Sequence, residues 1–214
     1  MNEWVTVNEP PNAGENASIP TWIFAHGAGA DKDHEFMSQV ATGLVTRGIR
    51  VVRFNFPYMV KRSQDGKRRP PDKAATLLST YIQVIEQWAD KPVVIGGKSM
   101  GGRMASLLAE HPNVRAIACL GFPFHPPGKA DNYKGGHLAS LMKPCLILQG
   151  ARDRFGSEEE CQNFMLSEAI QLHFIPDGDH SFVPRKRSGY RFESNMTLAL
   201  DLLAQFIWEV YDEK

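Results

Sequence analysis

The chain has 214 residues, of which 43% are hydrophobic and 22% are charged, and this composition is ordinary for a folded protein in water. Its 24 lysines and arginines balance 24 aspartates and glutamates, so overall charge excludes a strong pull toward nucleic acid or an anionic membrane surface. The length suits one hydrophobic core, and we therefore expect a single domain over residues 1–214.

The cysteines and the N-terminal segment indicate the expected cellular location of the protein. Cys119, Cys145 and Cys161 are an odd, widely spaced set, which is typical neither of a disulfide framework nor of a metal site. Residues 1–16 lack the basic and apolar regions of a secretory signal, and no apolar run is long enough to span a bilayer. We therefore expect a cytoplasmic protein that uses no metal, cofactor, membrane or nucleic acid.

Taken in chain order, short apolar runs alternate with amphipathic segments. The runs predict β-strands over residues 21–25, 51–54, 93–95, 116–120, 145–148 and 172–175, with residues 3–7 as a candidate edge strand. Apolar residues at helical spacing predict helices within residues 36–45, 77–88, 104–108 and 192–210. Asp33 is a candidate cap for the first helix, and Gly48 is a candidate stop. This alternation predicts an α/β fold, a three-layer α/β/α sandwich around a mostly parallel sheet.

The segment 94–103, VIGGKSMGGR, contains parts of two motifs. GKS is the end of a phosphate-binding loop, but that loop needs a glycine at position 92, where the chain has Pro92. GKSMG also matches G-x-S-x-G, the strand-to-helix turn that displays a nucleophilic serine. A predicted strand precedes this turn and a predicted helix follows it. We therefore favour Ser99 as a nucleophile over an incidental serine in a glycine-rich connection.

A nucleophilic serine needs a histidine base and an acid that orients the base, and with this turn they follow in the order Ser, acid, His. Asp153 comes directly after the strand predicted at 145–148, and His180 lies in the turn after the last predicted strand. Both are expected at the same sheet edge as Ser99, where the carboxyl ends of the strands meet. Five other side chains fit less well, because they lie within a strand, before the acid or too near the base in sequence: His173, His125, His137, Asp177 and Asp179.

Such a site also needs an oxyanion hole. One donor is expected to be the backbone N–H of Met100, the residue after the serine. The other is expected from the loop after an early strand, where residues 26–30 read HGAGA, and we place it at the Ala28 N–H. Glycines on both sides of Ala28 let the backbone approach a substrate closely. His26 is expected to hold this loop rather than to react.

The motifs HGAGA, GGKSMGG, GARD and DGDHSF, in that order, make the chain resemble the α/β-hydrolase superfamily from residue 21 onward. The resemblance implies Ser99 as nucleophile, His180 as base and Asp153 as orienting acid. The small size resembles the dienelactone-hydrolase-like branch, although those enzymes use cysteine where Ser99 stands, so their substrate is not implied. Few residues precede the first core strand, so we expect reduced N-terminal strands and a sheet of six or seven strands.

A closer resemblance rests on the combination of HGAGAD, GKRRPPD and GGKSMGGR. With these motifs the chain is similar to small predicted α/β-hydrolases, which are related to the hydrolase-like domain of a human chromatin-complex regulatory subunit. Because of that relation, the alternative hypothesis is a non-catalytic interaction module that has retained the fold.

Two long connections flank the expected site. Residues 58–71 form a basic loop in which Arg68 and Arg69 are candidates to bind an anionic group of the substrate, with a solvated surface loop as the alternative. Residues 121–143 are rich in proline and glycine and contain no long apolar helix, which predicts a minimal lid. Within that connection, Phe122 and Phe124 either wall the acyl pocket or pack over the sheet.

These features together predict a serine hydrolase that cleaves a small ester or thioester through an acyl-enzyme intermediate. Its expected partner is a small-molecule acyl substrate. A peptidase or an acyltransferase would use the same three side chains, and the interaction module would use none of them.

Overall fold

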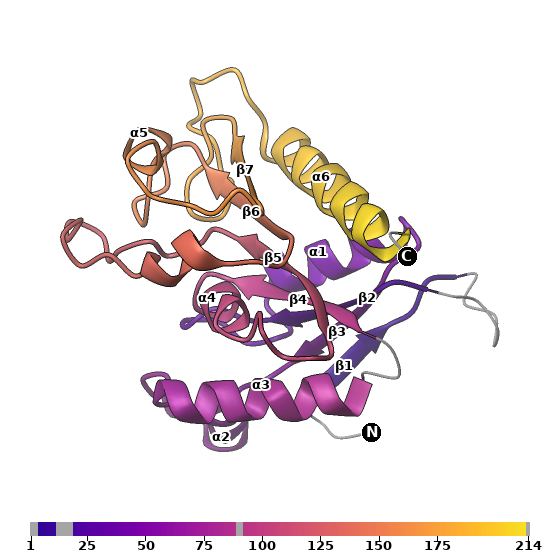
Figure 1. The fold of residues 1–214 in the computed structure, drawn as a ribbon. Coiled ribbons are helices and arrows are strands. Elements are labelled where there is room, and N and C mark those ends of the chain that lie inside the picture. Colours follow the sequence, from indigo (N-terminus) through magenta and orange to yellow (C-terminus); the bar gives the residue numbers. More distant parts are fainter. Residues whose placement is uncertain (1–3, 12–18, 89–91, 213–214) are drawn as a thin grey trace.

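The computed structural model describes residues 4–11, 19–88 and 92–212, within which seven strands form one mostly parallel sheet (Figure 1). The strand order is β1-β3-β2-β4-β5-β6-β7, and only the β1–β3 pair is antiparallel among these described strands. Their bounds are β1 (Val5–Asn8), β2 (Thr21–Ala25), β3 (Arg50–Phe54), β4 (Val93–Lys98), β5 (Val114–Leu120), β6 (Cys145–Gly150) and β7 (Ile170–Ile175). The predicted sheet of six or seven strands is confirmed.

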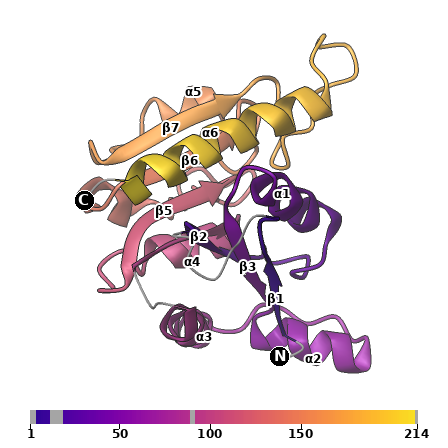
Figure 2. The same cartoon turned by 90° about the vertical axis from the view of Figure 1, so that its right-hand side faces the viewer.

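Helices cover both faces of this sheet (Figure 2). One face packs against α1 (Glu35–Val45) and α6 (Phe192–Asp212), and the other packs against α3 (Ala74–Trp88) and α4 (Met100–Ser106). The connections contain the shorter elements α2 (Pro57–Asp65), α5 (Glu158–Cys161) and a 3₁₀ helix, η1 (Gly136–Ser140). The predicted three-layer α/β/α arrangement is confirmed. Among the described helices, none combines the length and the apolar character needed to cross a membrane.

The central strands separate two hydrophobic cores, because strand side chains alternate between the two faces of a sheet. On β2, Trp22 and Phe24 belong to the core beneath α1 and α6, whereas Ile23 and Ala25 belong to the core beneath α3 and α4. Strands β4 and β6 are buried at every position, as expected for parallel strands that helices cover on both sides.

Tyr81 on α3 ties two central strands together from one of these cores. Its side chain is fully buried, and its hydroxyl accepts from the N–H of Gly96 on β4 at 2.9 Å. The same hydroxyl lies within donating distance of the carbonyls of Ile23 on β2 and of Gly96. This contact fixes α3 against β2 and β4 just before the turn that contains Ser99.

The structure corrects two local predictions. Most of the basic segment predicted as a loop is the helix α2, which begins with Pro57 at its first position and ends at Gly66 with φ of 69°. Proline in the first turn and glycine after the last turn are ordinary helix boundaries. The cap of α1 is His34 rather than Asp33: the His34 ring accepts from the Phe36 N–H at 3.3 Å.

The edge strand predicted over residues 3–7 is present as β1 from Val5 onward, whereas Trp4 lies in a turn and residue 3 lies outside the described residues. It extends one residue further than predicted, to Asn8, and pairs with β3.

Removing the Tyr81 hydroxyl takes an acceptor from the buried N–H of Gly96 and removes the single O–H that lies within reach of the carbonyls of Ile23 and Gly96. We expect Tyr81→Phe to lower the free energy of unfolding by about 1–3 kcal/mol, measured by urea denaturation. Tyr190→Phe is the control, because that ring is 52% exposed, and it should change stability by less than ~0.5 kcal/mol. Equal stability of Tyr81→Phe and wild type would contradict the anchoring role.

Candidate active site

Ser99 lies between β4 and α4 in a conformation that residues other than glycine rarely adopt, with φ of 52° and ψ of −117°. Two backbone hydrogen bonds hold it there. The Ser99 N–H donates to the carbonyl of Leu120 on β5 at 3.0 Å, and the Arg103 N–H donates to the carbonyl of Ser99 at 3.0 Å. A strained serine held between a strand and a helix is the geometry that the G-x-S-x-G pattern predicts.

Two glycines make this turn sterically possible. A Cβ atom at Gly97 would lie under 3.0 Å from the backbone of Gly101, and a Cβ atom at Gly101 would lie under 3.0 Å from the carbonyl of Ala25. These neighbours are backbone atoms, so they cannot rotate away as a side chain could. The turn therefore packs directly against the end of β2, from which the loop 26–30 continues.

Asp153 follows β6 and His180 follows β7, and the structure brings their side chains together. Asp153 Oδ2 lies 2.7 Å from His180 Nδ1. The Asp153 carboxylate is fully buried and also accepts from the Phe155 N–H at 2.9 Å and from the side-chain amide of Gln149 at 2.9 Å. Three donors thus satisfy a carboxylate that would be costly to bury alone.

Ser99 and His180 open onto the same cavity, which has a volume of about 420 Å³. Because Nδ1 of His180 contacts Asp153, Nε2 is the ring nitrogen that remains to accept a proton. Among the described residues the structure records no hydrogen bond between the Ser99 hydroxyl and the His180 ring, and such bonds are often long before a substrate binds. The residues lining the cavity are Gly27, Ala28, Gly29, Ala30, His34, Phe36, Met37, Lys98, Ser99, Phe155, His180 and Ser181.

The loop 26–30, which supplies four of these residues, is braced from beneath. His26 is fully buried, and its Nε2 accepts from the Phe56 N–H at 3.1 Å. Burial lowers the pKa of His26 to about 4, so the ring is neutral and its Nδ1–H can donate to the Gly27 carbonyl. The Tyr58 hydroxyl lies 3.1 Å from the Ala28 carbonyl. These contacts match the holding role expected for His26.

Lys98, the residue before Ser99, is an unexpected part of the site. Its side chain is only 9% exposed, and its ammonium donates to the backbone carbonyl of His180. The ammonium also lies 5.5 Å from the centre of the Phe36 ring. Burial lowers the pKa of Lys98 to about 8, while the charges of Asp153 and Asp179 oppose that change. The lysine is therefore charged at neutral pH and ties the end of β4 to the turn that carries His180.

The protonation of His180 responds to all of these neighbours. Burial lowers its pKa below the ordinary value of 6.5, and the hydrogen bond to Asp153 raises it. The Lys98 charge lowers the pKa further, whereas the charges of Asp153 and Asp179 raise it, and the net direction is downward. The ring of Phe155 packs on the imidazole at a centroid distance of 4.3 Å. His180 is thus held mainly as the neutral base near pH 7.

The residues predicted to bind substrate lie elsewhere. Phe122 and Phe124 are fully buried and belong to the core beneath α3 and α4, so of the two alternatives they pack over the sheet. Arg69 forms an ion pair with Asp65 at the end of α2, and neither Arg68 nor Arg69 lines the Ser99 cavity. This position favours a solvated surface segment for both arginines.

Sequence reasoning missed Gln149 and Lys98. Gln149 is fully buried at the end of β6, where it bonds Asp153 and the backbone of Phe122. The available signal was a polar residue inside the apolar run CLILQG. For Lys98 the signal was a lysine directly before the serine of the turn.

In the part of the chain that the structure describes, no group of three or more His, Cys, Asp or Glu side chains is placed to hold a metal ion. The groups at or beside the cavity are the serine, the histidine–carboxylate pair, the buried lysine and backbone N–H groups.

The chain matches a known family and is similar to solved structures. A family model described as alpha/beta hydrolase domain matches residues 18–208. Est1E from Butyrivibrio proteoclasticus, solved with ferulic acid bound, has a TM-score of 0.71 to this chain at 16% sequence identity, covering 95% of each chain.

Two further solved structures show the same fold. A dienelactone hydrolase from Anabaena variabilis has a TM-score of 0.70 at 20% identity, covering 96% of this chain and 90% of its own. An α/β serine hydrolase without a lid, from Xanthomonas campestris, has a TM-score of 0.67 at 19% identity, covering 96% of this chain and 88% of its own. At these identities the likeness concerns the fold.

The pKa of His180 offers a direct test of the site's electrostatics. An NMR titration of the His180 ring should give a pKa below 6.5. Lys98→Met should raise this pKa, because it removes a nearby cation that disfavours the imidazolium. Lys129→Met, at an exposed position, is the matched control and should leave it unchanged. An unchanged or lower pKa in Lys98→Met would show that the lysine charge does not act on the ring.

Proposed function

The chain belongs to the alpha/beta hydrolase domain family, and on that premise we propose that it is a serine hydrolase that cleaves a small ester or thioester. The observation that carries the proposal is that three side chains, Ser99, His180 and Asp153, lie at or beside one cavity. The strained Ser99 and the His180 ring both line it, and Asp153 holds the far side of that ring.

In the proposed reaction, the Ser99 hydroxyl attacks the carbonyl carbon of the ester while Nε2 of His180 takes its proton. The leaving group receives that proton as the tetrahedral intermediate collapses to an acyl-enzyme. Water then attacks the acyl group, with His180 again taking and returning a proton. Asp153 keeps the proton of the neutral ring on Nδ1, so that Nε2 faces the serine, and it stabilises the imidazolium that forms.

The developing oxyanion would be bound by the N–H groups of Met100 and Ala28. Met100 is the first residue of α4, where an N–H has no partner within the helix. Ala28 lies in the braced loop, which lines the same cavity as Ser99. Donors held in advance of the reaction stabilise charge as it develops and need little reorganisation.

The lowered pKa of His180 suits the base role. Its neutral form accepts the serine proton, so activity should be present above this pKa and fall as the pH drops through it, below the ordinary value of 6.5. The cavity of about 420 Å³ matches the lower range of small-molecule sites. The connection 121–143 contains only the short η1 among its described elements, and none of its residues lines the cavity, which favours a small, water-soluble acyl substrate over a lipid.

We expect Ser99→Ala to abolish covalent labelling by a fluorophosphonate probe, which reacts with activated serines, and to abolish hydrolysis of short-chain 4-nitrophenyl esters. Ser181→Ala is the matched control, because Ser181 also lines the cavity and has no part in the proposed reaction, and it should still be labelled. A wild-type protein that no fluorophosphonate labels would favour the non-catalytic interaction module instead.

Asp153→Asn should lower kcat by several orders of magnitude, and a loss of ~10⁴ is the scale of the equivalent change in another triad. The physical reason is tautomer control. An amide at position 153 that donates to Nδ1 of His180 leaves the ring proton on Nε2, and a protonated Nε2 cannot accept the proton of serine. A circular dichroism spectrum and a melting temperature would show whether the fold is kept. Near-normal turnover would mean that another carboxylate orients His180.

A further inference from the structure

A second cleft lies beside the Ser99 cavity. Its volume is about 240 Å³, it shares Phe155 with that cavity, and Met100 lines it next to Ser99. The remaining lining residues are Arg103, Pro123, His125, Pro126 and Lys134. The lining therefore contains three basic residues and no acidic one. A group bound there would be adjacent to the carbonyl of an ester held at Ser99.

Arg103 supplies the main charge of this cleft. It lies one helical turn after Ser99 on α4, is partly buried, and has its pKa lowered by that burial. Its Nε donates weakly to the Lys134 carbonyl at 3.5 Å. Among the described residues it forms no ion pair with a carboxylate. A guanidinium has five N–H donors, so most of those of Arg103 remain for a ligand.

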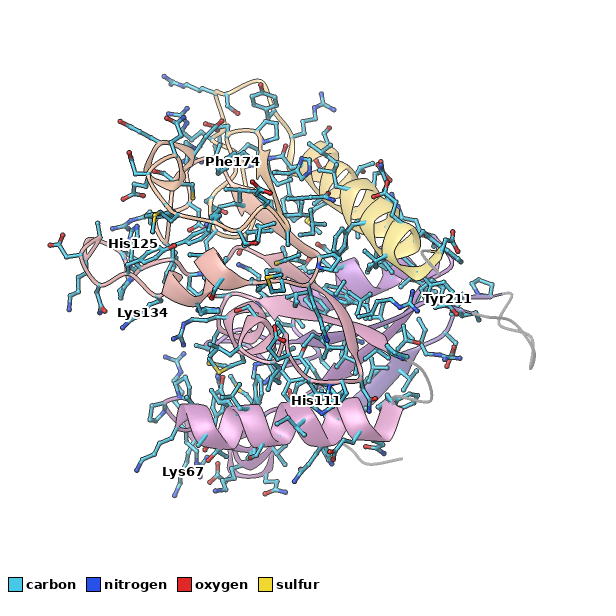
Figure 3. All side chains as sticks on the ribbon, in the orientation of Figure 1. Lys67, His111, His125, Lys134, Phe174 and Tyr211 are labelled. Atoms are coloured by element: carbon cyan, nitrogen blue, oxygen red, sulfur yellow. The ribbon has the colours of Figure 1, made fainter. Side chains whose placement is uncertain are left out.

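The other two basic residues differ from each other. His125 Nε2 lies 3.3 Å from a carboxylate oxygen of Glu160, so that acid balances any charge on the ring. Lys134 is exposed and has no ion pair in the described part of the chain. Figure 3 labels His125 and Lys134 on the same side of the molecule, where both line the cleft. The unbalanced charge of the cleft therefore belongs to Arg103 and Lys134.

We propose that this cleft binds a carboxylate carried by one arm of the ester, with Arg103 and Lys134 as the recognising groups. The proposal rests on the serine hydrolase function proposed above and names its substrate class. A guanidinium binds a carboxylate through two parallel N–H···O bonds, and the lysine adds a second positive charge. Phe155, Met100 and Pro123 offer apolar surface to the short carbon chain between the carboxylate and the ester.

Anchoring one end of the substrate would set the position of its carbonyl over Ser99, which is where orientation lowers the barrier. Lys98 is a weaker candidate for the anchor, although it lines the first cavity. Its ammonium is nearly buried and already donates to the His180 carbonyl. Recognition of an anionic group is thus assigned to Arg103 rather than to the basic segment of α2 and its continuation.

The test uses two pairs of matched esters. The first compares mono-4-nitrophenyl glutarate with 4-nitrophenyl valerate, which places the carboxylate on the acyl arm. The second compares the thioacetates of 3-mercaptopropionate and of propanethiol, which places it on the leaving arm. In at least one pair, kcat/KM should favour the carboxylated ester by about tenfold or more. Arg103→Met should reduce that ratio strongly, and Arg103→Lys should retain part of it because the charge remains while the fork is lost.

Two further variants control this result. Lys134→Met changes an exposed residue that no described helix contains, so it should reduce the same ratio without disturbing α4. Arg187→Met removes the same charge from an exposed arginine that lines neither cavity, and the ratio should stay at the wild-type value. An equal fall in Arg187→Met would show a general charge effect and overturn the assignment.

The outcomes separate the two proposals. Equal kcat/KM within both pairs, in a wild-type protein whose Ser99 is labelled by the fluorophosphonate, would overturn carboxylate recognition and leave the serine hydrolase standing. A preference that Arg103→Met and Lys134→Met both retain would also overturn it, because the carboxylate would then bind elsewhere. A protein that neither hydrolyses any of the esters nor reacts with the probe would overturn the serine hydrolase itself.

Discussion

The turn at Ser99 and the end of β2 meet backbone to backbone, with no space for a side chain between them. Gly97 and Gly101 permit this approach. Tyr81 also joins β2 and β4 just before this contact, through Ile23 on β2 and Gly96 on β4. Because the loop 26–30 continues directly from β2, this contact holds the serine and the Ala28 N–H in one rigid unit. The strain at Ser99 persists because the packing around it leaves no alternative.

The other half of the site is held by buried polar contacts rather than by close backbone packing. Asp153 satisfies its buried charge with Gln149, Phe155 and His180. Lys98 then links the two halves, since it begins at the end of β4 and reaches the His180 carbonyl. The positive charge of Lys98 and the negative charges of the carboxylates partly cancel, so both can be buried. Together with burial, these charges leave the pKa of His180 below its ordinary value, which favours the neutral imidazole.

Several features followed from the sequence because they depend on local pattern and on one general rule. Alternating apolar runs and amphipathic segments indicated the layers, and parallel strands bring their carboxyl ends to one edge. That rule placed Asp153 and His180 near each other, as the structure shows. The prediction of a loop at 58–71 was wrong for residues 58–65, because Pro57 and Gly66 bound a helix there, and it holds for residues 66–71. Phe122 and Phe124 were ambiguous because an aromatic residue after a strand suits either a cavity wall or the core.

The alternation of apolar runs and amphipathic segments predicted the α/β layers, and local motifs indicated the serine turn and an acid and a histidine after later strands. These signals are local, because strands, helix caps and tight turns each depend on residues a few positions apart. Which buried polar groups support the site, and which basic residues lie in or beside it, depends on the three-dimensional arrangement of the strands. Lys98 meets His180, and Arg103 meets Lys134, across 82 and 31 positions of the chain. Contacts of that kind arise when the sheet brings separate strand ends together, and no short stretch of sequence contains both partners.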